Sequence, residues 1–528
     1  MRDDYDVVII GSGIGGLSCA LSLINAGKRV LVLEQHNLPG GCATSFVRGR
    51  FEFDASLHEL CALGHPGNWG FTGKIIMEDY QLPIKWYYVD ELYRVIATAR
   101  SGKKYDVTLP TGIDAIIDKM EEYVPGSRKP MTEFFSLAKE CYEASEYFDN
   151  HMWDKKKSDG SIAIKTSVFI KHFFRYILVA ERPFNEVLRR INMPEDAIDI
   201  LNTYWVYQGS DLDELSFVSM AVMVYAYATM QPAIPHHTSH ALSVEAVEKI
   251  RKAGSDVYMN VKATKVVSDD DGNIIGVDTT IGFVPCKNIV GNINPATAYG
   301  QLLDKRIKIP KREKKKVNAI NFSTRFVNVY LGLNKTHEEL GIKNYTIFCP
   351  GDLDARTNME SSLSMDNISR CTMVCYNVVY PDCSPKGTTI LTLTIPFPTD
   401  NWANVNPRDY VKTKESVAKK AIQNFEQQTG IIITPYIEEI EIATPWTFAH
   451  YLGTPQGTVY GNHNTKWNSM VAQLLGIRND HPIKGFKTVG ASGARGDGYS
   501  QSYCSGRDIA NLLLEEMEGG KKRHGKKQ

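Results

Sequence analysis

The chain has 528 residues, more than one hydrophobic core usually serves, so we expect two or three packed units. Its 60 Lys and Arg residues balance 60 Asp and Glu residues, and this zero net charge implies no nucleic acid or other polyanionic partner. The hydrophobic content of 43% is ordinary for a soluble enzyme, and the charged start at 1–6 leads straight into an apolar strand, so no secretory signal is expected.

The strongest pattern in the chain is YDVVIIGSGIGGLSCALSLINAGKRVLVLEQH at 5–36. The continuous apolar run at 7–10 is typical of a strand that helices cover on both faces. The next residues fit G-x-G-x-x-G with Gly11, Gly13 and Gly16. In this motif the glycines allow a tight turn, close approach of the backbone to a pyrophosphate, and close packing of helix on strand. The following helix, over about 15–26, would present free N–H groups to phosphate.

A second apolar strand, over 29–33, ends at Glu34. A carboxylate in this position can accept hydrogen bonds from ribose hydroxyls, which suits FAD or NAD and disfavours the 2′-phosphate of NADP. The unit therefore predicts a doubly wound α/β domain that binds a dinucleotide. The alternative is the same sheet without a ligand.

The segment PGGCATSFVRGRFEFDASLHEL at 39–60 helps to choose the cofactor. Alone, Cys42 and His58 would suit a nucleophile or a metal site. Gly40 and Gly41 lack side chains, however, so the segment can run close along a ligand. NAD-binding chains usually continue into another βα unit at this point, so the segment favours FAD.

With this continuation the N-terminal region resembles flavoproteins of the glutathione-reductase type, in the superfamily of the amine oxidases and phytoene desaturases. Residues 34–60 are similar to the E-x-x-x-x-x-G-G-C-x-x-x-F…F-D-x-x-x-H pattern of the retinol saturases and carotenoid isomerases. Desaturases commonly carry an arginine just after the glycine pair. Cys42 therefore places the resemblance nearest to the saturase and isomerase branch.

Three later segments resemble the same superfamily. A hairpin around 271–272 is similar to its second flavin-domain segment, in which a backbone near Val261 meets the adenine. Residues 289–299, IVGNINPATAY, are similar to its V-x-S-N-A-x-P run. Residues 481–514 resemble its closing motif, in which a strand ends in glycines and a helix beginning near Tyr499 approaches the flavin.

By this resemblance, four parts of the chain form the cofactor site: the glycine loop, the acid after the second strand, the glycine pair with its cysteine, and the later segments. The implied residues are Gly11, Ser12, Gly13, Ile14, Gly15, Gly16, Glu34, Gln35, Gly40, Gly41, Cys42, Val261, Asn292, Gly490, Ser492, Gly498, Tyr499 and Ser500.

The resemblance implies an α/β fold. It consists of a glutathione-reductase-type Rossmann domain for FAD, discontinuous in sequence, and a mixed α+β substrate domain with a helical lid. The ranges are 1–70, 236–310 and 461–515 for the cofactor domain, 71–235 and 311–460 for the substrate domain, and 516–528 for a basic, disordered tail.

Within the substrate domain we expect helices over about 71–230, including 132–153 and 167–191. Strands are expected over about 318–460, among them RFVNVYLGL and GTTILTLTIPF. The longest uncharged stretch, 215–235, is interpreted as a buried helix, because a proline limits it and a membrane span needs about 20 predominantly apolar residues.

The helix expected at 167–191 mixes aromatic and basic side chains. We interpret it as an amphipathic lid; the alternative is a helix that dips into a membrane interface and makes the protein peripheral there. The basic end of the tail is expected to be solvated, with attraction to acidic lipids as the alternative.

The ten cysteines are scattered without zinc spacing, and no metal site is expected. Cys371 and Cys375 are four apart in a strand-like run, and no second pair accompanies them. We therefore expect reduced thiols and a cytoplasmic location, and the alternative is a disulfide framework.

The resemblance implies an FAD-dependent oxidoreductase that saturates or isomerises C=C bonds of a long hydrophobic molecule, such as a polyene, retinoid, carotenoid or unsaturated lipid. Flavin N5 exchanges hydride in such enzymes, and desaturation of an isoprenoid shares the same frame and stays open. Reduction also needs a proton donor, which an imidazole with its ordinary pKa of about 6.5 would suit. The candidates are His58, His236 and His237, with Tyr460 as a weaker one. The alternatives are a structural role for His58 and a plain loop at the histidine pair.

The reductant is not visible as a second domain, because no other G-x-G-x-x-G follows a strand. Transiently bound NAD(P)H, an electron-donor protein, or flavin that stays reduced in an anaerobic host would fill this role. A different class of function is a non-catalytic escort of prenylated or lipid-like molecules, as in the guanine-nucleotide dissociation inhibitors, whose fold is related. The complete glycine run and Glu34 favour the enzyme.

Overall fold

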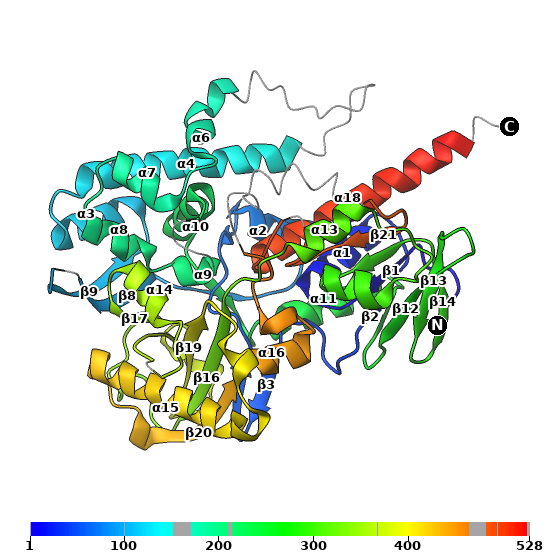
Figure 1. The fold of residues 1–528 in the computed structure, drawn as a ribbon. Coiled ribbons are helices and arrows are strands. Elements are labelled where there is room, and N and C mark those ends of the chain that lie inside the picture. Colours follow the sequence, from blue (N-terminus) through cyan, green and yellow to red (C-terminus); the bar gives the residue numbers. More distant parts are fainter. Residues whose placement is uncertain are drawn as a thin grey trace.

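The structure is a computed structural model that describes residues 2–99, 101–151, 170–209, 214–366, 368–463, 482–493 and 495–524. A parallel sheet and a larger, mainly antiparallel sheet lie next to each other, and a group of helices covers the upper end of the larger one (Figure 1).

The parallel sheet has five strands in the order β11-β2-β1-β15-β21. They are β1 (Val7–Ile10), β2 (Val30–Leu33), β11 (Asp256–Tyr258), β15 (Ile289–Gly291) and β21 (Phe486–Thr488). All neighbouring strands run parallel, and they come from each of the three segments 1–70, 236–310 and 461–515.

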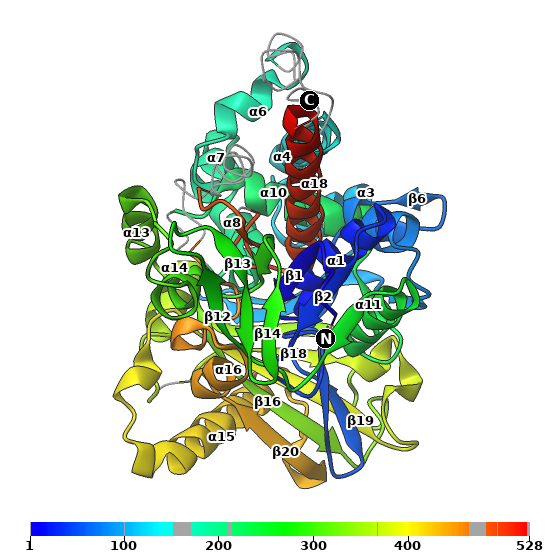
Figure 2. The ribbon, with the colours of Figure 1, turned by 90° about the vertical axis from the view of Figure 1, so that its right-hand side faces the viewer.

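Burial on both faces explains the continuous apolar run of β1. Val7 and Ile9 pack in one hydrophobic core with residues of the helices α1 (Ile14–Asn25), α11 (His240–Lys252) and α18 (Tyr499–His524). Figure 2 shows these helices beside β1 and β2. Val8 and Ile10 pack instead against a three-stranded antiparallel sheet of β12 (Ala263–Ser268), β13 (Ile274–Thr279) and β14 (Gly282–Pro285). The predicted hairpin around 271–272 is confirmed, but the expectation of helices on both faces is wrong for this face, because the small sheet occupies it.

The larger sheet has seven strands in the order β20-β16-β19-β18-β17-β8-β9. They are β8 (Glu91–Thr98), β9 (Lys104–Pro110), β16 (Arg325–Leu333), β17 (Thr346–Asp352), β18 (Cys371–Cys375), β19 (Thr389–Phe397) and β20 (Ile437–Ala443). The strands predicted at RFVNVYLGL and GTTILTLTIPF are confirmed as β16 and β19.

The two faces of this sheet have different neighbours. Alternate residues of β16, Val327 and Val329, pack under α15 (Tyr410–Thr429) in one hydrophobic core. The residue between them, Asn328, points to the opposite face together with Thr394 of β19, and both line a cavity. One face of the sheet therefore packs in a hydrophobic core, and the other forms a partly polar wall of the cavity.

The expectation of helix throughout 71–230 is wrong at 86–110. This stretch forms β7 (Trp86–Tyr88), β8 and β9, and β8 pairs with β17 far along the chain. In β9, buried and more exposed residues alternate, which is the period of a strand.

The remaining part of 71–230 is largely helical and shares one hydrophobic core. Its main helices are α3 (Ile113–Tyr123), α4 (Arg128–His151), α6 (Phe174–Val179), α7 (Phe184–Arg190), α8 (Glu195–Asn202), α9 (Trp205–Gln208) and α10 (Phe217–Met230). The helix predicted at 132–153 is confirmed as α4 as far as His151, and residues 152–153 lie outside the described residues. The uncharged stretch contains the buried helix α10, as expected.

The single helix predicted over 167–191 is wrong in its described part. Helix ends at 172, and two short helices, α6 and α7, follow; Pro183 precedes α7 because proline cannot continue a helix. Residues 167–169 lie outside the described residues. Phe174 and Leu178 of α6 are exposed, which is compatible with membrane contact. Contact of this region with a membrane stays a prediction.

Short elements connect these layers. They are β3 (Ser45–Arg48), β4 (Phe51–Asp54), β5 (Gly64–His65), β6 (Asn68–Trp69), β10 (Ala233–Pro235), α2 (Phe71–Gly73), α12 (Pro295–Thr297), α13 (Lys311–Asn318), α14 (Ala355–Ser361) and α16 (Pro445–Leu452).

Helix α18 begins at Tyr499, as predicted, and projects from the body toward the C-terminus (Figure 1). The expected disorder from 516 onward is wrong as far as His524, because the helix continues to that residue. Glutamate and lysine, both strong helix formers, flank the two glycines at 519–520. Residues 525–528 lie outside the described residues. None of the helices in the described ranges is both long enough and apolar enough to cross a membrane.

Candidate functional site

A cavity of about 780 Å³ lies between the parallel sheet and the seven-stranded sheet. Its volume is within the range typical of small-molecule sites. Every residue predicted to contact the cofactor lines this cavity except Ser12 and Gly16, which pack behind the wall. The structure therefore brings together residues from the beginning, the middle and the end of the chain.

The loop between β1 and α1 forms a wall of backbone. Gly11 has a φ of +95°, and Gly13 precedes α1 without any side chain capping the helix. A Cβ atom on Gly15 would lie 2.6 Å from the Cα of Gly490, and one on Gly16 would lie 2.3 Å from the carbonyl oxygen of Gly11. Larger residues cannot fit at either position. The uncapped N-terminus of α1 suits a phosphate group.

Glu34 is held in a fixed orientation at the edge of the cavity. Its Oε2 atom accepts hydrogen bonds from the backbone N–H and the hydroxyl of Ser12, at 2.8 and 2.7 Å. Its Oε1 atom accepts one from the N–H of His36 at 2.9 Å. Ser12 thus orients the carboxylate that the sequence assigns to a ribose.

The glycine pair runs directly beside the glycine loop. The N–H of Gly40 donates to the carbonyl of Ser12 at 3.0 Å, and a Cβ on Gly41 would lie 3.4 Å from the Cα of Gly13. Gly40 has a φ of +117°, where a Cβ would lie 2.0 Å from the carbonyl oxygen of Ala43. The close approach expected of this pair is therefore a property of the backbone.

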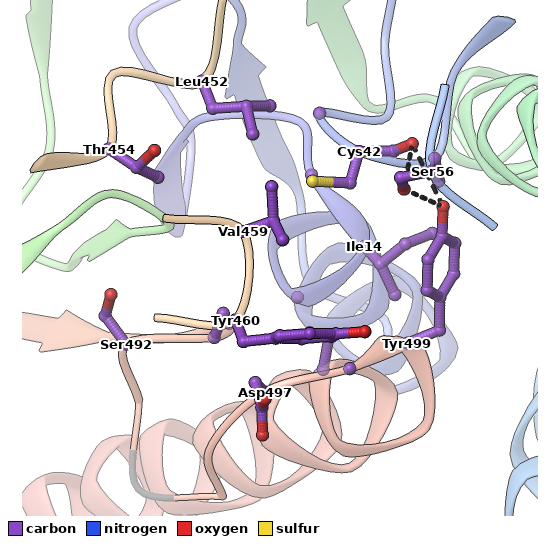
Figure 3. Close-up of a pocket in the computed structure, with 18 of the residues that line it drawn as sticks. Ile14, Cys42, Ser56, Leu452, Thr454, Val459, Tyr460, Ser492, Asp497 and Tyr499 are labelled. Carbon is purple, nitrogen blue, oxygen red and sulfur yellow. Dashed lines mark hydrogen bonds between the residues drawn. The ribbon is translucent and has the colours of Figure 1, made fainter. Parts of the chain in front are cut away.

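The start of α18 is fastened to the same segment (Figure 3). The Tyr499 hydroxyl donates to the carbonyl of Cys42 at 3.0 Å, and the Ser56 hydroxyl contacts the same carbonyl at 3.1 Å. The Ser500 hydroxyl donates to the carbonyl of Cys61 at 3.1 Å. The closing motif and the N-terminal segment therefore form one side of the cavity together.

Cys42 has no chemistry of its own in this environment. Burial raises the pKa of its thiol to about 11, with a smaller contribution from the carboxylate of Asp54. A thiol in this state is a poor nucleophile and a poor metal ligand at neutral pH. Among the described residues, no group of three or more His, Cys, Asp or Glu side chains is placed to hold a metal ion.

His58 lies in the cavity wall between two hydroxyl groups. Its Nδ1 atom is 3.3 Å from the Tyr207 hydroxyl, and its Nε2 atom is 3.1 Å from Oγ1 of Thr394. Burial lowers the pKa of the imidazole to about 4. Burial therefore favours the neutral imidazole at pH 7, and a role of His58 as proton donor stays a prediction.

The other predicted donors fall into two groups. His236 and His237 do not line the cavity; the ring of His236 lies 5.0 Å from that of Tyr380 and 3.7 Å from that of His237. Tyr460 does line it, and burial raises the pKa of its hydroxyl. Tyr460 and His58 thus line the same cavity, and the histidine pair does not.

Two carboxyl groups in the cavity wall were missed. Burial raises the pKa of Glu59 to about 8 and that of Asp497 to about 7. Asp497 lies just below the ring of Tyr460 in Figure 3. The available signals were an acid inside the apolar run 57–63 and an acid between two glycines of the closing motif.

The part of the cavity farthest from the glycine loop is mixed in character. Apolar and aromatic side chains come from α9, α10 and the seven-stranded sheet, and hydroxyl and amide groups lie among them. They are Val206, Tyr207, Val222, Met223, Tyr227, Phe326, Asn328, Thr372 and Thr394.

Comparisons with known proteins agree with this geometry. A family model described as an NAD(P)-binding Rossmann-like domain matches residues 9–70. An all-trans-retinol 13,14-reductase from Danio rerio is 25% identical over 517 residues, covering 92% of this chain and 82% of the relative. The chloroplastic prolycopene isomerase 1 of an Oncidium hybrid cultivar is 24% identical over 560 residues, covering 97% of this chain and 85% of the relative.

Among solved structures, a putrescine oxidase aligns with a TM-score of 0.61 and 11% identity, covering 97% of this chain and 99% of its own. This likeness concerns the fold, whereas the sequence relatives extend beyond the Rossmann unit to nearly the whole chain. The chain is therefore similar over nearly its whole length to retinol 13,14-reductases and prolycopene isomerases, and it shares the fold of a putrescine oxidase.

Proposed function

We propose that the protein is an FAD-dependent oxidoreductase that reduces or isomerises C=C bonds of a long hydrophobic molecule, such as a polyene, retinoid, carotenoid or unsaturated lipid. The observation that carries this proposal is that the same cavity extends from the glycine loop to the mixed apolar wall of α9, α10 and the seven-stranded sheet. Cofactor and substrate can therefore meet inside it. The relatives named for retinol and prolycopene support this substrate class.

The residues present fit FAD. The backbone of Gly13 and Gly15 at the start of α1 would hold its pyrophosphate, and Glu34 would accept hydrogen bonds from a ribose. The glycine pair and the start of α18 would flank the rest of the molecule. When bound, FAD supplies hydride exchange.

The protein itself would orient the substrate and exclude water. Val222, Met223 and Phe326 offer apolar contact to a hydrocarbon chain, while Tyr207 and Thr394 hold the imidazole of His58 in place and burial favours its neutral form. A wall without ionised histidine is suited to a substrate that brings no charge.

The source of electrons is a further part of the proposal. The Rossmann match at 9–70 coincides with the unit assigned to FAD, so it does not indicate a separate site for NAD(P)H. Transiently bound NAD(P)H or an electron-donor protein would therefore supply the electrons. Desaturation is the second candidate reaction; the names of the relatives favour reduction and isomerisation over it.

Spectroscopy and anaerobic turnover test the proposal. We expect the purified protein to show flavin absorbance, and its reduced form to be reoxidised by at least one member of a panel of polyenes, retinoids, unsaturated fatty acids and enones. Product analysis by mass and by cis–trans isomer distinguishes reduction from isomerisation. A protein without flavin that still binds prenylated peptides would support the escort function instead. A flavoprotein that transforms no compound in the panel would contradict the substrate class.

A further inference from the structure

Glu59 is a buried acid without a partner in the cavity wall. Its side chain is only 7% exposed, and neither carboxyl oxygen has a hydrogen-bond partner among the described residues. It lines the cavity immediately after His58. Because an ionised carboxylate is strongly destabilised in such a place, Glu59 is held there as the neutral acid.

Among the described residues, no cation is placed to stabilise the ionised form of Glu59. Burial is the main cause of its raised pKa, the Tyr207 hydroxyl opposes the shift, and the charge of Glu91 on β8 adds a smaller contribution in the same direction as burial. The other titratable groups within electrostatic reach in the described structure are Cys61, Tyr204, Tyr227, Tyr345, Tyr376 and Tyr460, and none of them carries a positive charge.

The other groups in the cavity are less suited to give up a proton. His58 is neutral at pH 7, and burial raises the pKa of the Tyr207 and Tyr460 hydroxyls above their ordinary range. Asp497 precedes α18, beside the closing motif assigned to the cofactor. Glu59 instead shares its neighbours Tyr207 and Tyr227 with the wall assigned to the substrate.

We propose that Glu59 is the general acid that protonates the substrate when a C=C bond is reduced. This inference rests on the proposed function. Bound reduced FAD would supply hydride, as a two-electron reductant, to one carbon of the double bond, and Glu59 would give its proton to the adjacent carbon. The π bond and the O–H bond of Glu59 would break, two C–H bonds would form, and Glu59 would be left as a carboxylate. It regains a proton from solvent when the product leaves.

Turnover of the flavin-loaded enzyme tests the role with a Glu59→Gln variant. Gln has nearly the same shape as a protonated Glu but cannot donate this proton, so we expect turnover to fall by about 100-fold or more. Reduction of the flavin by dithionite should be unchanged. Glu59→Asp should recover part of the activity. Glu52→Gln, which removes an exposed carboxylate from the preceding strand, is the matched control.

The pH profile separates Glu59 from Asp497. Turnover of the wild type should decline as the pH rises through about 8, the pKa to which burial raises Glu59. This decline should persist in Asp497→Asn and Glu52→Gln. If the Glu59→Gln variant turns over as fast as the wild type and shows the same decline with pH, the assignment is overturned.

Thermal unfolding gives a readout that needs no substrate. Because the folded pKa of Glu59 lies above its unfolded value of about 4.3, the folded state retains a proton that the unfolded chain releases. The wild type should therefore lose stability relative to Glu59→Gln as the pH rises from about 5 to 8. If no compound is transformed, the proposed function fails, and this comparison decides the state of Glu59: equal pH dependence of the two proteins overturns the assignment.

Discussion

At the scale of single residues, two neighbours respond to the same burial in opposite directions. Burial lowers the pKa of His58 to about 4 and raises that of Glu59 to about 8. Both shifts favour the uncharged form. At pH 7 this part of the cavity wall therefore carries neither an imidazolium nor a carboxylate, although the sequence shows a histidine followed by a glutamate.

His58→Gln tests whether the imidazole donates a proton. Gln can keep one of the contacts to Tyr207 and Thr394, so we expect turnover to fall by much less than the roughly 100-fold loss typical of a removed general acid. The shape of the pH profile should not change. A loss of that size, with the pH dependence abolished, would return His58 to the role of donor. Steady-state kinetics between pH 5 and 9 makes the comparison.

Residues whose role depends on backbone shape were predictable, and residues whose role depends on burial were not. Gly11, Gly40 and Gly490 occupy conformations with positive φ that few other residues adopt. Their structural role can therefore be inferred from the presence of glycine in the sequence. Glu59 and Asp497 are ordinary acids in the sequence. Their protonation state follows from elements that only the folded chain places around them.

At the scale of elements, the contact between α1 and α18 depends on missing side chains. Gly506 of α18 lies against α1, where a Cβ would be 2.5 Å from the carbonyl oxygen of Gly15. The Ser18 hydroxyl of α1 donates to the carbonyl of Tyr503 at 2.6 Å. The two helices therefore hold the glycine loop and the closing motif in one fixed relation.

Gly15→Ala should lower the flavin content of the purified protein. The added Cβ would lie 2.6 Å from the Cα of Gly490, so the closing motif must move away from the start of α1. Gly300→Ala is a matched control, because its Cβ would meet nothing within 4 Å. The ratio of flavin to protein absorbance measures the effect. Equal ratios in both variants would show that this contact does not shape the cofactor site.

The misprediction at 86–110 has a physical cause. β8 is stabilised by pairing with β17, and Val95 of β8 lies opposite Phe348. A partner so far along the chain leaves no mark on the local sequence, whereas the alternation in β9, which pairs with β8, is a local strand signal that the helical prediction overlooked. β16 and β19 were predictable because nine consecutive residues of each are buried and rich in β-formers.

At the scale of the whole molecule, a buried charge cluster joins the helical region to the cofactor side. Asp149 of α4 forms ion pairs with Arg495 of the closing motif and Arg507 of α18. Arg495 also pairs with Asp508 at 2.6 Å. Burial alone would raise the pKa of Asp149, but the two guanidinium groups hold it well below its ordinary value.

Asp149→Asn should destabilise the protein by roughly 3 kcal/mol, because it leaves buried guanidinium charge incompletely paired. The stabilisation from a lowered carboxyl pKa is present above about pH 4 and is lost as the pH falls further, so the two proteins should converge in acid. Thermal unfolding between pH 7 and 3 measures this difference. Asp118→Asn, which breaks an exposed pair with Arg128, should change stability by less than about 1 kcal/mol. Equal effects of both substitutions would refute a special role for the cluster.

The layout of the molecule was predictable where the resemblance supplied landmarks. The glycine loop, the hairpin near 271 and the strand before the closing glycines all lie in or beside the parallel sheet, as their motifs implied. The breaks between α6 and α7 and the length of α18 were not, since they depend on how the helices pack.

Because β21 and α18 follow the rest of the parallel sheet in the chain, the cofactor cavity is completed only late in synthesis. The glycine loop leaves the ribosome well before Gly490 and Tyr499, which line the same cavity. A nascent chain that has reached 460 has made most of the cavity wall but lacks the edge strand β21 and the helix that closes the N-terminal segment. Cofactor capture is therefore expected to wait until β21 and α18 have been made, and until then the apolar faces of β15 and α1 lack their last packing partners.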